Sequence, residues 1–266
     1  MPTAITHQLL AEEVYESLPA AARAEIFSPP LYYFGAQGPD VCFAYNPAAP
    51  ADENFGRLLH TRAPLLFFRL LAAAAKGNGA VRSYALGYIT HYAADTVFHP
   101  YVYAVMRAFQ REGRYFHHAV EHAVDGVLLK ELRGEGLFSY RLPRPRKIPA
   151  EIYAVYARYA CACGREALNE ATFRRAVRRY YAANALRTPF YRAVYARRAA
   201  RLFSEAKQRS LRLIGIFLEE EGEGLRAEDF GRHFLTGEVA EGKNAGPGGK
   251  KSAEKNKKAE KTEKNG

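Results

Sequence analysis

Residues 88–100 have the sequence Tyr88-Ile-Thr-His91-Tyr-Ala-Ala-Asp95-Thr-Val-Phe-His99-Pro100. His91, Asp95 and His99 recur every four residues, slightly more than one helical turn, so their side chains rise along one face of a helix. Imidazole and carboxylate groups are zinc ligands, and ligands on one rigid face need little ordering when a metal binds. Pro100 disfavours helical geometry at the residue before it, which predicts that the helix kinks or ends at His99.

Helical periodicity extends over most of the chain, and no strand pattern of period two stands out, so we expect an all-α, multi-helix bundle. The expected helices span 3–18, 19–26, 55–76 with a bend at Pro64, about 80–100, 112–133, 150–164, 168–184 and 189–221. Residues 31–54 are rich in Gly, Pro and aromatics and are predicted to form a loop. Asp40 lies in that loop, either as a turn residue or as a ligand.

The composition is that of a soluble globular protein, 48% hydrophobic and 25% charged, with a formal net charge of +11. A basic chain suits an anionic partner such as a phosphate ester, nucleic acid or an acidic lipid surface. We expect one domain over 1–237, with its motifs in 3–130 and Tyr/Arg-rich helices over 148–222. The Lys/Glu/Gly-rich tail, 238–266, is expected to be disordered. No signal peptide or membrane span is visible, which predicts a cytoplasmic protein with three reduced cysteines.

Histidines are distributed unevenly along the chain. Seven of the eight lie between residues 7 and 122. Chance gives roughly 0.8 histidines followed by an acid at the i,i+4 spacing, so one such pair alone is no sign of a metal site. Two pairs occur, His91/Asp95 and His117/Glu121, on successive expected helices. Antiparallel helices can bring such pairs together across a bundle core, so the pattern indicates a metal site.

The order of these residues resembles the zinc-dependent phospholipase C family, whose all-α fold is shared with the S1/P1-type nucleases. The eight positions that carry the resemblance are His7, Asp40 in Gly-Pro-Asp, His60, His91, Asp95, His99, His117 and Glu121. The resemblance implies two or three zinc ions: one on Asp40, His60, His91 and Asp95, a second on His99, His117 and Glu121, and a third on His7 with Asp95 bridging. Secreted members complete the third site with an N-terminal tryptophan, which this chain lacks.

A zinc cluster suits hydrolysis of a phosphate ester. Zinc lowers the pKa of a bound water and neutralises phosphate oxygens as charge develops. Carboxylates such as Asp40 and Asp95, the expected catalytic residues, can ligate, orient or accept a proton. Phospholipid, nucleic acid and small phosphodiesters all suit such a cluster. The resemblance implies a phospholipase C-like phosphodiester hydrolase, with an S1/P1-like nuclease as the alternative.

Two further interpretations stay open. His118-Ala-Val-Glu121-His122 is a literal His-x-x-Glu-His, the signature of inverted zinc peptidases, with Glu121 as general base. Alternatively the chain is a non-catalytic helical protein with a structural metal or none. Residues 173–203 then form a binding surface, because arginines interleaved with tyrosines can contact phosphates and stack on bases.

Overall fold

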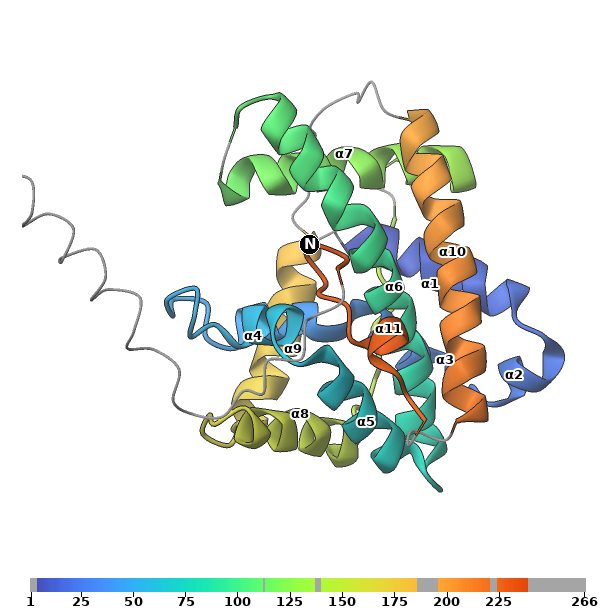
Figure 1. Ribbon diagram of the computed structural model, residues 1–266, viewed down its shortest axis with the longest axis vertical. Helices are drawn as coiled ribbons and strands as arrows, with labels where there is room; N and C mark the ends of the chain where they lie inside the picture. The colour runs from blue at the N-terminus through green and yellow to red at the C-terminus, as the bar shows by residue number, and fades with distance from the viewer. Residues whose placement is uncertain (1–3, 112, 137–139, 186–195, 221–223, 239–266) are drawn as a thin grey trace, which may run out of the picture.

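The computed structural model describes residues 4–111, 113–136, 140–185, 196–220 and 224–238, and no β-strand occurs among them (Figure 1). The all-α prediction is therefore confirmed. The elements are α1 (Ala4–Ser17), α2 (Ala20–Ala24), α3 (Pro29–Gln37), the 3-10 helix η1 (Gly38–Ala44), α4 (Phe55–Thr61), α5 (Pro64–Ala75), α6 (Gly79–Ala108), α7 (Arg114–Arg133), α8 (Ala150–Ala162), α9 (Glu170–Ala185), α10 (Ala196–Glu219) and α11 (Ala227–Phe230).

Helix α6 is the central element of the fold. Its 30 residues span about 45 Å at the usual helical rise, and α3, α5 and α10 pack along it while α1 and α7 contact it as well. Asn78 caps its start by accepting a hydrogen bond from the Val81 amide. Every residue from Ser83 to His99 is buried. A helix buried on all sides has no solvated face, so polar residues on it lie in the protein interior.

Proline 100 does not end this helix, which was one of the two outcomes expected from the sequence. α6 continues through it to Ala108. A proline inside a helix costs about 3 kcal/mol, because it lacks an N–H donor and clashes with the preceding turn. Phe98 and Val102, on either side of Pro100, are both buried at 1% exposure. Tertiary packing of such residues outweighs the local penalty of the proline. Local helix propensity does not include this packing, so the sequence did not reveal it.

The glycine- and proline-rich stretch is more ordered than the predicted loop over 31–54. α3 and η1 occupy residues 29–44, so that prediction was wrong for its first part. Pro29 stands at the first turn of α3, where its missing N–H costs nothing and its fixed φ favours the helix. Gly35 lies inside α3 without breaking it. An added Cβ there would stand 2.1 Å from the Tyr84 carbonyl oxygen of α6, so the glycine lets α3 approach α6 closely.

The expected single helix over 55–76 is two helices, α4 and α5, that meet at an angle of 99°. Ala63 adopts a left-handed conformation, φ +44°, directly before Pro64. A residue before proline is pushed out of the helical region, so the chain turns there rather than bending smoothly. The turn directs α4 toward the middle of α6.

The second half of the chain agrees with the predicted helices, since α8 and α9 fall within about two residues of the expected ranges and α10 occupies the described part of the range 189–221. The tail from 239 and the segment 186–195 lie outside the described residues. No single helix in the described ranges is long and apolar enough to cross a membrane; the bent pair α4 and α5 meets the length and composition test only when taken together.

We expect Gly87→Ala to destabilise the protein by about 3 kcal/mol, because a Cβ there would overlap the carbonyl oxygen of Tyr32 on α3. Backbone cannot move aside as a flexible side chain can. Thermal unfolding should show a midpoint lowered by roughly 2–4 °C per kcal/mol. The control is Gly215→Ala in α10, where an added Cβ meets nothing within 4 Å. Equal midpoints for the two variants would contradict the close packing of α3 on α6.

Candidate metal centre

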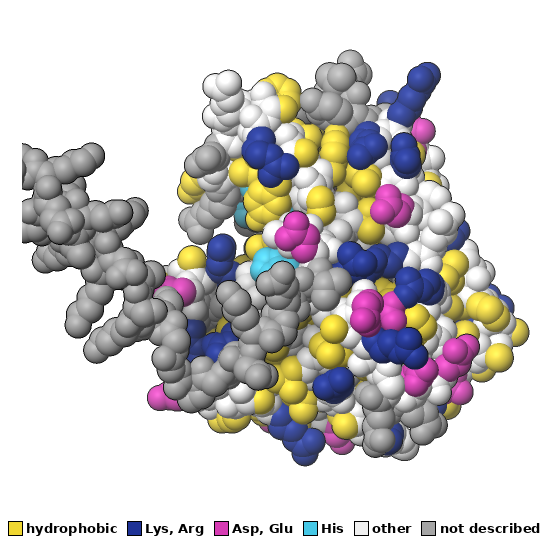
Figure 2. Space-filling model, viewed as in Figure 1, with side chains coloured by type: hydrophobic (Ala, Val, Ile, Leu, Met, Phe, Trp, Pro, Cys, Tyr) yellow, Lys and Arg dark blue, Asp and Glu magenta, His cyan; other side chains and the backbone are white. Residues whose placement is uncertain are grey.

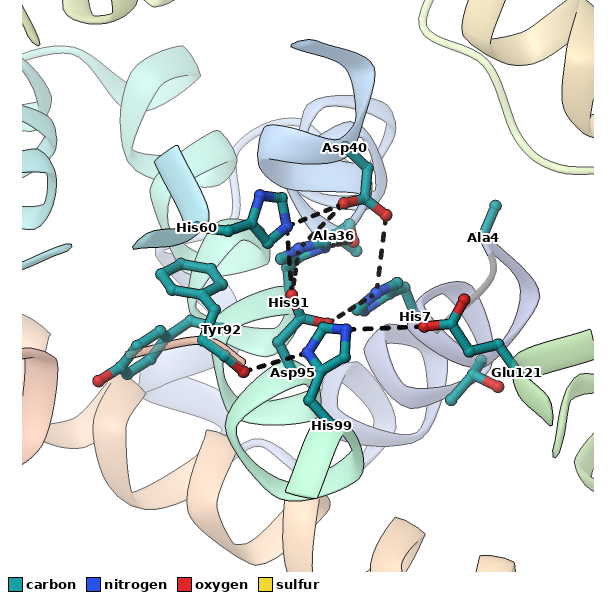
Figure 3. A network of polar contacts seen from close by, with 12 residues as sticks. Ala4, His7, Ala36, Asp40, His60, His91, Tyr92, Asp95, His99 and Glu121 are labelled. Carbon is teal, nitrogen blue, oxygen red and sulfur yellow. Dashed lines mark hydrogen bonds and ion pairs between the residues drawn. The ribbon is translucent and has the colours of Figure 1, made fainter. Parts of the chain in front are cut away.

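Eight side chains from α1, η1, α4, α6 and α7 meet beside the middle of α6, and Figure 3 labels all of them except His117. They are the eight residues that the sequence predicted: His7, Asp40, His60, His91, Asp95, His99, His117 and Glu121. All are buried except His117, whose side chain is 11% exposed. Their role as metal ligands remains a prediction. The distances between their donor atoms can be compared with those of known zinc sites.

The first group of donor atoms surrounds one point between η1, α4 and α6. His60 Nε2 lies 3.1 Å from Asp40 Oδ1 and 3.3 Å from Asp95 Oδ2. His91 Nε2 lies 3.7 Å and 3.2 Å from the same two oxygens. Ligands bound tetrahedrally at about 2.0–2.1 Å from zinc stand about 3.3–3.4 Å apart. The measured distances of 3.1–3.7 Å are close to this spacing, and Asp40, His60 and His91 form a group that could hold a metal ion.

Histidine 7 joins this group from α1. Its ring stacks on His91, with centroids 3.9 Å apart, and its Nε2 lies 3.4 Å from Asp95 Oδ1 and 3.9 Å from Asp40 Oδ2. Asp95 therefore presents one oxygen to the first group and the other to His7. His7, His91 and Asp95 together could hold a metal ion. This is the arrangement expected of a carboxylate that bridges two ions.

The second group forms where α6 meets α7. His117 Nε2 lies 2.7 Å and His99 Nε2 lies 3.6 Å from Glu121 Oε1. His99 Nδ1 lies 3.7 Å from Asp95 Oδ1, which connects the two groups. Three protein ligands leave further coordination positions for water or substrate, as in catalytic zinc sites.

Backbone carbonyls fix the orientation of three of the imidazoles. His60 Nδ1 lies 2.7 Å from the Gly56 carbonyl, His91 Nδ1 3.0 Å from that of Ala36, and His99 Nδ1 3.1 Å from that of Phe234. A carbonyl only accepts, so each Nδ1 carries the hydrogen in these bonds. When the ring is neutral, Nε2 is left with its lone pair facing the carboxylates. This is how metal-binding histidines are held in proteins.

Without a metal, the cluster leaves buried polar atoms that destabilise the folded state. The His7, His60 and His91 Nε2 atoms and both oxygens of Asp40 and of Asp95 are buried without a hydrogen bond in favourable geometry. Buried polar atoms in that state destabilise a fold unless another partner satisfies them. The residues therefore fit zinc, which would accept the lone pairs of all these groups at once.

The carboxylates also alter the charge state of the imidazoles. Burial lowers the pKa of His60, but the facing carboxylates of Asp40 and Asp95 outweigh it and raise that pKa to about 9. Burial lowers the pKa of His91 and of His99. Burial raises the pKa of the Asp95 carboxyl, yet the facing histidines hold it well below its usual range. A metal ion at the first group would therefore displace a proton from His60.

Two supporting contacts could not be found from the sequence. Gly38, at φ +43°, lies so close to His91 that a Cβ there would stand 2.8 Å from the His91 ring carbon Cγ. Asp125 Oδ1 accepts hydrogen bonds from the Thr6 amide, at 2.9 Å, and from its hydroxyl, at 2.5 Å. The second contact ties the start of α1 to α7 and so positions His7. Nothing in the spacing of these residues indicates that they meet.

The alternative sites of the sequence analysis are less well formed. The His118 side chain is 46% exposed, and the donor group at α7 consists of His99, His117 and Glu121 rather than His118 and His122.

In α9, Tyr180 and Tyr181 are buried, and the Tyr180 hydroxyl donates to Gln37. These two rings do not offer faces on which bases could stack.

Comparison with known proteins agrees with this geometry. Residues 6–184, more than half of the chain, match the sequence profile of a family described as zinc-dependent phospholipase C. No match was found among curated proteins or among solved structures. The matched range contains all eight donor residues and runs from the first turn of α1 to the last turn of α9. The chain belongs to the zinc-dependent phospholipase C family.

Proposed function

We propose that the protein hydrolyses phosphodiesters with two or three zinc ions held by the eight clustered residues. The observation that supports it most is the set of buried imidazole Nε2 atoms that face shared carboxylate oxygens at 3.1–3.7 Å, with Nδ1 held by backbone carbonyls in three cases. A buried hydrogen-bonded histidine network without a metal would satisfy these atoms among themselves. Here they are left unsatisfied.

The ligand assignment follows the contacts. Asp40, His60, His91 and Asp95 would hold the first zinc, and His99, His117 and Glu121 the second. His7 and Asp95 would contribute to a third. Because both Asp40 and Asp95 are buried with their oxygens directed at histidines, we propose that they act as ligands.

The chemistry depends on where charge develops. When bound, zinc supplies a nucleophilic hydroxide near neutral pH and neutralises the non-bridging oxygens of a phosphodiester. Asp95 would fix the position of His91 relative to His7, because its Oδ2 faces His91 and its Oδ1 faces His7. The surrounding side chains are apolar and aromatic, with Phe43 and Phe234 against His60, and they exclude water from the ligands.

Two alanine substitutions separate this proposal from the peptidase alternative. We expect His117→Ala to reduce zinc content and to lower phosphodiester hydrolysis by about 10²-fold or more, because it removes a ligand. His118→Ala, one residue away and 46% exposed, should change both by less than about threefold. Zinc per chain and the rate on bis(p-nitrophenyl) phosphate are the measurements. The reverse order of effects, with peptide cleavage in the wild type, would favour the peptidase register instead.

For the substrate, we propose a phospholipid rather than a nucleic acid. Family membership supports a phosphoester of this kind. In α9, the burial of Tyr180 and Tyr181 also removes two of the rings on which bases could stack if residues 173–203 bound nucleic acid. A comparison of rates on dispersed phospholipid and on single-stranded DNA tests this choice, and faster cleavage of DNA would overturn it.

A further inference from the structure

The metal centre is closed to solvent on most sides. Of its eight donor residues, seven are at most 1% exposed, and His117 in the first turns of α7 is 11% exposed. His118 beside it is 46% exposed. The second donor group therefore reaches solvent at the start of α7. A substrate phosphate that contacts this group has to approach from that side.

Two large aromatic side chains project into solvent at this place. Phe109, directly after α6, is 55% exposed, and Tyr115, in the first turn of α7, is 81% exposed. Isolated exposed hydrophobic residues are common on soluble proteins and need no explanation. These two lie within seven residues of each other on the connection between α6 and α7, and Tyr115 precedes His117 by two residues. We call this connection, residues 107–111 and 113–116, the α6–α7 tip.

The tip also carries positive charge and more aromatic surface. Phe116 contacts Phe109, with ring centroids 5.9 Å apart, and the Arg111 guanidinium lies 5.8 Å from the Phe116 ring centroid. Arg107 and Arg111 are both exposed. Figure 2 shows hydrophobic and basic side chains next to one another over α7 and the end of α6, beside a hollow in which a histidine is visible.

This combination suits the interface of a lipid bilayer. Tyrosine, with an apolar ring and one polar edge, is favoured at the level of the headgroups, and an exposed phenylalanine adds apolar surface that can insert beside it. Each Lys or Arg near an anionic surface contributes about 1 kcal/mol of attraction. A protein-binding surface would instead bury its aromatic anchors in a centre surrounded by a polar rim. Here the rings are at the end of a protruding connection, which can enter a soft interface without a complementary partner surface.

We propose that the α6–α7 tip docks the protein on a phospholipid bilayer, with Phe109 and Tyr115 inserted among the headgroups and Arg107 and Arg111 at anionic lipids. Docking in this orientation turns the exposed side of His117 toward the membrane. The choice of lipid as the substrate rests on the proposed function, whereas membrane binding by the tip is a separate property that can be measured without turnover.

The absence of tryptophan from the chain provides a clean reporter. Tyr115→Trp places a single indole on the tip. Phe27→Trp is the matched control, because Phe27 is 66% exposed but packs beside Gly79, at the opposite end of α6. With vesicles of phosphatidylcholine and phosphatidylglycerol, emission of the Tyr115→Trp protein should shift to shorter wavelength and be quenched by bromine-labelled lipids. The Phe27→Trp protein should show neither effect. Equal responses, or no response at position 115, would overturn the proposal.

Substitution tests the energetic contribution of the tip. The double variant Phe109→Ala, Tyr115→Ala should bind these vesicles about tenfold more weakly or worse, because it removes two inserted rings. Phe27→Ala should bind as the wild type does. Both variants should retain wild-type zinc content and wild-type hydrolysis of soluble bis(p-nitrophenyl) phosphate. Unchanged vesicle binding by the double variant would refute docking through the tip. Normal vesicle binding by a wild type that hydrolyses no phosphodiester would instead refute the proposed function and leave the docking surface standing.

Discussion

Asp95→Asn is expected to lower phosphodiester hydrolysis by about 10³-fold and to reduce zinc content by at least one ion per chain. Asp95 lies within 3.2–3.7 Å of four imidazoles, those of His7, His60, His91 and His99. An asparagine of the same shape keeps one oxygen but loses the negative charge and the second ligand atom. The loss therefore affects both donor groups. Elemental analysis of protein purified without chelator and the rate on a soluble phosphodiester are the two measurements.

The matched control is Asp229→Asn. Asp229 is also a poorly exposed carboxylate, at 9%, but it pairs with Arg212 outside the cluster. Its substitution should leave the zinc content unchanged and the rate within about twofold of the wild type, because surface-facing ion pairs contribute little. If Asp95→Asn retained full zinc content and activity, Asp95 would be a structural acid, and the assignment of both zinc groups would fail with it.

Much of the fold was predictable because its long helices carry a strong periodic signal. The expected ranges for α7, α8 and α9 agree with the structure to within about two residues at each end. The failures lie where local signals and tertiary packing disagree. Pro100 and Gly35 favour a break locally, but burial of Phe98 and the close approach of α3 to α6 dominate. A prediction from sequence uses only the local backbone preferences of Pro and Gly. It therefore assigns loops or helix ends to residues that tertiary packing keeps helical.

The gathering of the eight donor residues was predictable by a different route. Their types and order resemble those of zinc-dependent phospholipases C, and the structure brings all eight together. The spacing of these residues along the chain does not predict the hydrogen bonds that orient their imidazoles. The carbonyls of Ala36 and Phe234 orient His91 and His99, and they belong to segments 55 and 135 residues away. Any residue type supplies a carbonyl, so no residue identity marks these positions.

Removal of zinc is expected to destabilise the fold severely. A ligand that binds only the folded state adds about 4 kcal/mol of stability when present at 1,000 times its dissociation constant, so two such ions add about 8 kcal/mol. At roughly 2–4 °C per kcal/mol, a strong chelator should lower the unfolding midpoint by more than about 10 °C. Readdition of zinc, but not of magnesium, should restore it, because imidazole-rich sites favour zinc.

The physical reason for this effect is the charge left behind. Without metal, Asp40 and Asp95 are buried next to each other, both in contact with His60, and the pKa of Asp95 is held well below its usual range. Burial of charged groups is unfavourable unless all of them are compensated. Asp95→Asn removes one of these charges. Chelation should therefore lower the unfolding midpoint of the Asp95→Asn variant by less than it lowers the midpoint of the wild type. A chelator that shifts neither midpoint would show that the cluster is satisfied by its own hydrogen bonds, and the zinc proposal would have to be abandoned.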